Sequence, residues 1–260
     1  MPDIAALGLS AWQIVVIALA LFLSGVIKGA TGAGTPILAV PVMAAVVDVR
    51  FAILTMLMPN LLTNIWQAFR FREHQPERQF LWKYVIAGGL GVAAGTLVLA
   101  TVDTGILSIV VSLSVLVYVG IRLSRPNWSL SLSAGKRLAV PAGLAAGILQ
   151  GSTGLAAPAL LSFLNALRLE RLTFVATVSL VFVTFSVVHT GSLAIGGFIT
   201  MPAILISFLA VAPIAVGMSV GTRILALINA ATFDRTILGL LTVIAVWNIV
   251  QAVMRTLAGG

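Results

Sequence analysis

A lysine among small residues, in a very apolar chain, is the first sign of chemistry. The stretch "SGVIKGATGAGTPILAVP", Ser24 to Pro41, places Lys28 beside glycines, threonines and prolines. A lysine at the centre of a bilayer costs at least about 2.5–3.5 kcal/mol on insertion scales, so an intramembrane lysine is a candidate for function. The alternative is that Lys28 lies near a helix end and extends its ammonium group to the membrane surface. We favour function, because the neighbouring residues predict a break in the helix.

The glycines and the proline after Lys28 predict this break. Gly32 and Gly34 permit bends that other residues resist. Pro36 suits the first turn of a new helix, and Thr35 is suited to cap it. Such a helix start presents unpaired N–H groups and about half a positive charge, so it binds anions. Inside a membrane, unwound backbone is tolerated only against protein or a wet cavity. The stretch therefore predicts an anion site within the protein.

The same pattern returns in "AGILQGSTGLAAPALLSF", Ala146 to Phe163. At one constant offset, Gly25, Gly29, Thr31, Gly32 and Pro36 match Gly147, Gly151, Thr153, Gly154 and Pro158. Two helix starts that face each other would form an electropositive site, although close helix packing through small residues is the alternative role for the glycines. The predicted binding residues are Lys28, Gly29, Thr31, Gly32, Gly34, Asn64, Gln150, Gly151, Ser152, Thr153, Gly154 and Ser186.

Polar side chains also interrupt the apolar segment that follows each copy. Asn60, Asn64 and Gln67 are spaced four and three residues apart, so they share one helix face. Ser186 and His189 match Asn64 and Gln67. This face is predicted to line the substrate path, with His189 as proton carrier. Interhelical hydrogen bonding is the alternative, and for His189 a position near the membrane surface is another.

Enzyme chemistry is not indicated. The seven Asp and Glu residues fall near expected loops or helix ends, cysteine is absent, and there are only two histidines. A nucleotide-binding G-x-x-x-x-G-K-[ST] motif is absent as well. We therefore expect no catalytic residues, no metal site and no cofactor.

Composition assigns these motifs to a membrane protein. The chain of 260 residues is 60% hydrophobic and 8% charged, whereas soluble domains carry about 25% charged residues. Its apolar runs do not alternate as β-barrel strands do. We therefore predict an all-α polytopic membrane protein. The net charge of +8 falls mostly in short loops, which favours topology signals over nucleic-acid binding. Apolar segments are expected at 11–28, 36–47, 51–69, 81–101, 105–121, 138–150, 156–167, 172–195, 200–228 and 236–254.

Two repeated halves are predicted. Residues 1–123 form the first transmembrane repeat, 124–137 a cytoplasmic linker, and 138–260 the second repeat. Each repeat begins with a glycine-broken helix pair, either re-entrant or spanning, and continues with three transmembrane helices. Re-entrant pairs imply inverted repeats, whereas spanning pairs imply a parallel 4+4 arrangement. We favour inverted repeats because they alone also place Arg168, Arg171, Arg223 and Arg235 on the cytoplasmic side, where basic residues accumulate. Arg50 and Arg255 then lie outside.

The duplicated motifs "GVIKGATGAGTPILAVPVM" and "GILQGSTGLAAPALLSFL" resemble those of the TauE/SafE family of sulfite exporters and sulfonate uptake permeases. The resemblance extends from about Ser24 to Val250, although the first copy holds fewer consecutive glycines than the family pattern. It implies a multi-pass secondary transporter of the bacterial inner membrane that moves sulfite or an organosulfonate by alternating access.

Three alternatives stay open at this point: an anion channel, a carrier for carboxylates or other oxyanions, and a non-transporting assembly subunit. The expected partners are the small anionic substrate and the lipid bilayer, without nucleic acid. A homodimer is compatible with a small transporter, and no residue in the sequence indicates one.

Overall fold

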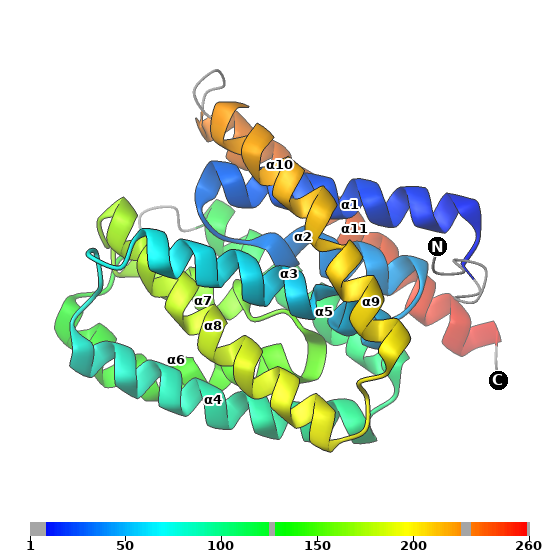
Figure 1. Ribbon diagram of the computed structural model, residues 1–260, viewed down its shortest axis with the longest axis horizontal. Helices are drawn as coiled ribbons and strands as arrows, with labels where there is room; N and C mark the ends of the chain where they lie inside the picture. Colours follow the sequence, from blue (N-terminus) through cyan, green and yellow to red (C-terminus); the bar gives the residue numbers. More distant parts are fainter. Residues whose placement is uncertain (1–8, 125–127, 225–229, 259–260) are drawn as a thin grey trace.

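The computed structural model describes residues 9–124, 128–224 and 230–258 (Figure 1). All regular secondary structure in these ranges is helical, which confirms the predicted all-α class. The helices are α1 (Ala11–Thr31), α2 (Thr35–Val46), α3 (Val49–Arg70), α4 (Arg78–Thr101), α5 (Thr104–Ser124), α6 (Leu132–Thr153), α7 (Ala157–Ala166), α8 (Arg171–Ile195), α9 (Met201–Leu209), α10 (Val211–Ile224) and α11 (Ala230–Ala258). Part of the predicted linker (125–127) and the side chain of Arg255 lie outside what is described.

Five described helical stretches are long and apolar enough to cross a membrane. They are α1, α4, α5, α8 and the stretch 201–223, in which α9 and α10 meet at Ala210. This confirms a multi-pass membrane protein. In contrast, α2 and α7 have 12 and 10 residues. At 1.5 Å per residue they reach only about 18 and 15 Å, so neither spans a 30 Å hydrocarbon core alone.

The first helix break lies where the glycines predict it. α1 ends at Gly32, whose φ of 82° is left-handed and whose N–H donates to the Lys28 carbonyl over 2.7 Å. Gly34, with φ 93°, precedes α2, and Pro36 lies in the first turn of α2. Glycine adopts such angles without a Cβ clash, which explains why the helix ends here. The expectation that Thr35 caps α2 was wrong: Gly34 occupies the cap position, and the Thr35 hydroxyl is buried without a partner.

The second break repeats the left-handed glycine that ends the first helix, but the residue before its second helix is right-handed. α6 ends at Gly154, with φ 72°, and the Gly154 N–H donates to the Gln150 carbonyl over 2.8 Å. Ala156 precedes α7, which has Pro158 in its first turn. Both predicted breaks are therefore present in the described helices.

Each broken pair folds back on itself as a hairpin. In the first pair, the Gln13 side chain near the start of α1 donates to the carbonyl of Val46 at the end of α2 over 2.9 Å. In the second pair, the backbone N–H of Leu130, just before α6, donates to the carbonyl of Ala166 at the end of α7 over 2.7 Å. The start and the end of each pair thus lie side by side, as in a re-entrant element.

The two hairpins open at opposite ends of α3. The first opens beside the start of α3 at Val49, because α2 leads directly into α3. The second opens near the far end, where Lys136 of α6 forms a salt bridge of 2.6 Å with Glu77, in the connection from α3 to α4 directly before α4. In Figure 1, α1 starts on the side of the N label, whereas α6 starts on the opposite side. The inverted-repeat interpretation remains a prediction, and this arrangement supports it.

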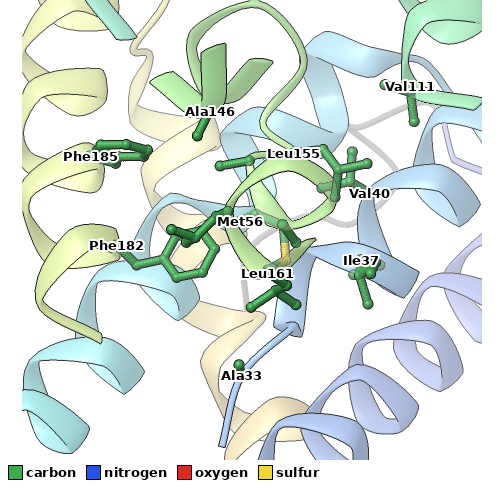
Figure 2. Packing of buried hydrophobic residues seen from close by; sticks show 14 of the residues in the cluster. Ala33, Ile37, Val40, Met56, Val111, Ala146, Leu155, Leu161, Phe182 and Phe185 are labelled. Carbon is green, nitrogen blue, oxygen red and sulfur yellow. The ribbon is translucent and has the colours of Figure 1, made fainter. Parts of the chain in front are cut away.

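Packing between the halves is reciprocal. α1 packs along α10, and α6 packs along α4 (Figure 1). α3 contacts α8, and α5 contacts α11. A continuous apolar core fills the space between these pairs and includes Val40 of α2, Met56 of α3, Leu161 of α7 and Phe182 of α8 (Figure 2). The helix pairs around this core hold both breaks in place.

Candidate functional site

Lys28 lies inside the protein and does not extend to the surface. Lys28 is only 1% exposed, and its Nζ donates a hydrogen bond of 2.7 Å to Asn64 Oδ1 of α3. Asn64 Nδ2 in turn donates to the backbone and side-chain oxygens of Asn60, over 2.7 and 2.9 Å. Asn60 and Asn64 therefore share one face of α3, as their spacing predicts, and this face holds the ammonium group.

The Lys28 ammonium group is only partly satisfied. A lysine has three N–H donors, and within the described residues one of them has a hydrogen-bond acceptor. The described residues also place no carboxylate within salt-bridge distance of Lys28. An unpaired charge is costly to bury, so such a group favours an anion as its partner.

Gln150, which matches Lys28 in the repeat, hydrogen-bonds to the backbone of its own half. Gln150 Oε1 accepts a hydrogen bond of 3.2 Å from the N–H of Ala156, which belongs to the second break. The side chain therefore satisfies one of the amides that the sequence suggested for anion binding. Ser186, which matches Asn64, is buried, and its Oγ lacks a partner. In the first break, the N–H of Ala33 has a comparable side-chain acceptor, Thr31 Oγ1, at 3.3 Å.

The hydroxyl groups at the breaks bond locally. Thr31 donates to Ile27 and Ala33 carbonyls, and its side chain is exposed. Ser152 and Thr153 donate to the carbonyls of Ile148 and Leu149, four residues earlier. The hydrogen of each hydroxyl is therefore already engaged, and the oxygen lone pairs can only accept hydrogen bonds. Each of the three hydroxyl groups must rotate before it can donate to an anion.

Apolar side chains lie between the two breaks. Gly32 packs against Val175, and Gly154 packs against Ile53, which matches Val175 at the repeat offset. In Figure 2, Met56 and Leu161 lie between Ala33 of the first break and Leu155 of the second. The structure therefore holds the breaks in equivalent surroundings, with hydrophobic packing between them.

Two cavities adjoin the first break. The larger, of about 580 Å³, is bounded by the end of α1, by α3, by the start of α8 and by α10, and it includes Gly29, Gly32 and Gln67. The smaller, of about 150 Å³, lies on the other side of the break and includes Thr31, Gly34 and Arg122. The break that carries Lys28 is therefore also the one that adjoins these open spaces.

Sequence reasoning overlooked part of this region. Arg171 and Thr63 line the larger cavity, but Arg171 entered the prediction only as a topology signal and Thr63 not at all. Arg171 comes directly after a predicted loop, and a basic residue there is indistinguishable by sequence from any other cytoplasmic loop charge. Thr63 precedes Asn64 within the polar stretch, which was a usable signal.

His189 lies apart from both cavities. It is 1% exposed, its ring is hydrogen-bonded to the backbone of Gly151, and its Nε2 has no partner. In the repeat, His189 matches Gln67, and Gly151 matches Gly29. Both Gln67 and Gly29 line the larger cavity. Positions 67 and 189 are thus equivalent in the repeat, but only Gln67 lines one of these two cavities.

The helices, the two hairpins and the buried cation together define a multi-pass membrane protein of the transporter class. The family described as "Sulfite exporter TauE/SafE" has a model that matches residues 17–247, and the chain belongs to this family. Membership confirms the resemblance and makes the protein a transporter of sulfur-containing anions in the general sense of the family. Neither a curated protein nor a solved structure gives a match.

Proposed function

We propose that the protein carries sulfite or an organosulfonate across the bacterial inner membrane by alternating access. The observation that carries this proposal is the buried Lys28, which has a neutral partner in Asn64 and unused donors beside a broken helix. A sulfur oxyanion supplies both the charge and the acceptor oxygens that this group lacks. Hydrogen bonds of this charge-assisted kind are about twice as strong as neutral ones.

Lys28 and Asn64 form the centre of the proposed site, and the backbone of Gly29, Gly32 and Gly34 completes it from the same half. The second half contributes through the Gln150–Gly154 segment and Ser186 once the apolar contacts between the breaks separate. Transporters built from inverted repeats commonly bind substrate where the repeats meet. The opposed hairpins fit this scheme, because rocking one half against the other would open the site first to one side and then to the other.

The membrane potential sets the energetics of direction. Moving one negative charge out of a cell with a negative interior releases about 2.3 kcal/mol per 100 mV. Export of an anion therefore needs no coupling ion, whereas uptake requires H⁺ or Na⁺. His189 is the proposed proton carrier for the uptake mode, and its burial means that any proton would reach it through a rearrangement of α8.

The test compares Lys28→Gln with the parent and with Lys83→Gln, an exposed lysine on α4 that serves as control. Lys28→Gln gives the first half the same residue that the second half has at the matching position, Gln150. Binding is measured by calorimetry on purified protein with sulfite, sulfoacetate, taurine, thiosulfate and matched carboxylates, and flux is measured in proteoliposomes.

We expect Lys28→Gln to lose about 10- to 100-fold in affinity, because hydrogen bonds to charged groups contribute about 1.5–3 kcal/mol. Lys83→Gln should bind like the parent. The proposal is wrong if the parent binds and transports none of these sulfur anions, or if Lys28→Gln binds them as well as the parent does. Preference for carboxylates would instead support the carboxylate carrier.

A further inference from the structure

The larger cavity has a built polar corner that the proposed Lys28 site does not use. Gln67 lines this cavity and is only 4% exposed. Gln67 Oε1 accepts a weak hydrogen bond of 3.4 Å from Ser179, while Gln67 Nε2 donates to no described residue. A buried amide donor without an acceptor, facing a cavity, needs a ligand or water to satisfy it.

Arg171 supplies the charge at the same place. It occupies the first position of α8 and lines the cavity. The one contact described for it is a hydrogen bond of 3.4 Å from Nη2 to the carbonyl of Ala30 at the end of α1. A guanidinium group has five N–H donors in a planar fork that fits an oxyanion. The start of α8 adds the positive end of a helix dipole to this corner.

The rest of the cavity is apolar. Trp66 of α3, Phe71 just after α3, Leu172 of α8 and Met218 of α10 form its walls. Its volume of about 580 Å³ far exceeds that of a bare oxyanion, which is only a few times larger than the ~30 Å³ share of a water molecule. A ligand that uses both the polar corner and the apolar walls carries a charged head and a carbon chain.

We infer that this cavity is a capture site for an organic anion, whose head group binds Arg171 and Gln67 and whose carbon chain packs against Trp66 and Phe71. The inference rests on the proposed function, since the captured anion is the one transported. Gln67 lies three residues from Asn64 on α3 and shares its polar face. That face therefore leads from the capture site to the Lys28 ammonium group.

The experiment uses the full chain in neutral phosphatidylcholine nanodiscs and titrates sulfite and a series of alkylsulfonates of increasing chain length. The variants are Arg171→Gln, Gln67→Leu and Trp66→Ala. Arg137→Gln is the control, because Arg137 is exposed and does not line the cavity. Glutamine at 171 removes the charge while keeping a polar N–H donor at this position.

In the parent, each added methylene should tighten binding by up to about fourfold. Trp66→Ala should flatten this dependence, and Arg171→Gln should weaken alkylsulfonate binding at least about tenfold while sulfite binding changes less. Gln67→Leu should weaken alkylsulfonate binding by a smaller factor. Arg137→Gln should match the parent throughout.

Three results overturn the inference. The first is an equal effect of Arg171→Gln and Arg137→Gln, and the second is an affinity independent of chain length. The third is that the cavity binds only an anionic lipid. Native mass spectrometry would then show phosphatidylglycerol bound to protein from phosphatidylglycerol nanodiscs, while alkylsulfonates fail to bind. If Lys28→Gln still abolishes sulfite binding in any of these cases, the proposed function survives and only the capture site fails. If the parent binds no sulfur anion of any kind, both fail.

Discussion

The two halves share one framework and differ in what their breaks adjoin. In the first half, the break adjoins the capture site through Gly32 and the smaller cavity through Gly34, and Lys28 lies one turn earlier in α1. In the second half, Gly154 to Ala157 are buried, and Gln150 satisfies the break from within. At the other end of α8 lies a cavity of about 400 Å³, but its lining is mainly apolar, including Leu97, Ile195 and Phe198.

This difference indicates how a repeated framework becomes directional. The glycine contacts and hairpins are built alike in both halves, as the proposed rocking motion requires. The charged groups gather at one break: Lys28 of the first half and Arg171 of the second both lie at the end of α1. An anion that approaches from the end with Arg171 therefore meets cations and donors, whereas the opposite end of α8 offers hydrophobic surface.

The largest predicted effect tests what the halves have in common. A Cβ at Gly25 would overlap the carbonyl of Ile214 on α10, and a Cβ at Gly147 would overlap the carbonyl of Gly88 on α4. The contacted atoms are backbone, so they cannot move aside as a side chain would. Overpacking typically costs about 1–3 kcal/mol and more when the backbone must shift. Gly25→Leu and Gly147→Leu should both abolish a monodisperse peak in size-exclusion chromatography.

Gly191→Leu is the matched control for these two variants, since no atom lies near an added Cβ at that helical position. It should elute and melt like the parent. If only one of the two interface variants misfolds, the halves do not carry equal structural roles, and the first part of the comparison fails.

The framework was largely predictable, and the reason is the strength of the local signals. The glycine and proline clusters leave the chain few ways to continue a helix, so the breaks at 32–34 and 154–156 followed from sequence. The apolar runs likewise predicted the long helices. The split of the 200–228 segment at Ala210 was missed, although Pro213 in the first turn of α10 was a usable signal. Its missing N–H leaves the carbonyl of Leu209 without the usual helical donor.

The site was only partly predictable. The spacing of Asn60, Asn64 and Gln67 indicated one polar face, and Lys28 lies against that face. The side-chain partners within the second half, such as Gln150 with Ala156, depend on how one turn closes, which spacing does not determine. Arg171 reaches its cavity because α8 starts beside the end of α1, a tertiary contact between residues 141 positions apart.

The next prediction sharpens the difference between the halves at one matched pair. Asn64→Ala removes the acceptor of the buried Lys28 ammonium group, which should cost about 1.5–3 kcal/mol in the free energy of unfolding. Ser186→Ala removes a buried hydroxyl that has no partner, so it should be neutral or slightly stabilising. Thermal or denaturant unfolding in the same detergent measures both. Equal losses for the two variants would mean that the Lys28 bond contributes nothing special to the first half.

The smallest predicted effect concerns His189. Glutamine at this position has the residue type of its match, Gln67, and still offers a donor to the Gly151 backbone. His189 is 1% exposed and lines none of the three cavities described above. His189→Gln should therefore leave anion affinity within about twofold of the parent, an amount close to 0.4 kcal/mol at 1.4 kcal/mol per tenfold change. In the export mode, which needs no coupling ion, it should also leave the pH dependence of flux unchanged between about pH 5 and 8, where an ordinary histidine titrates. Flux in proteoliposomes across that range measures this. Loss of the pH dependence in His189→Gln, with affinity retained, would instead assign the proton-carrier role to the second half and make the two halves complementary, one for the anion and one for the proton.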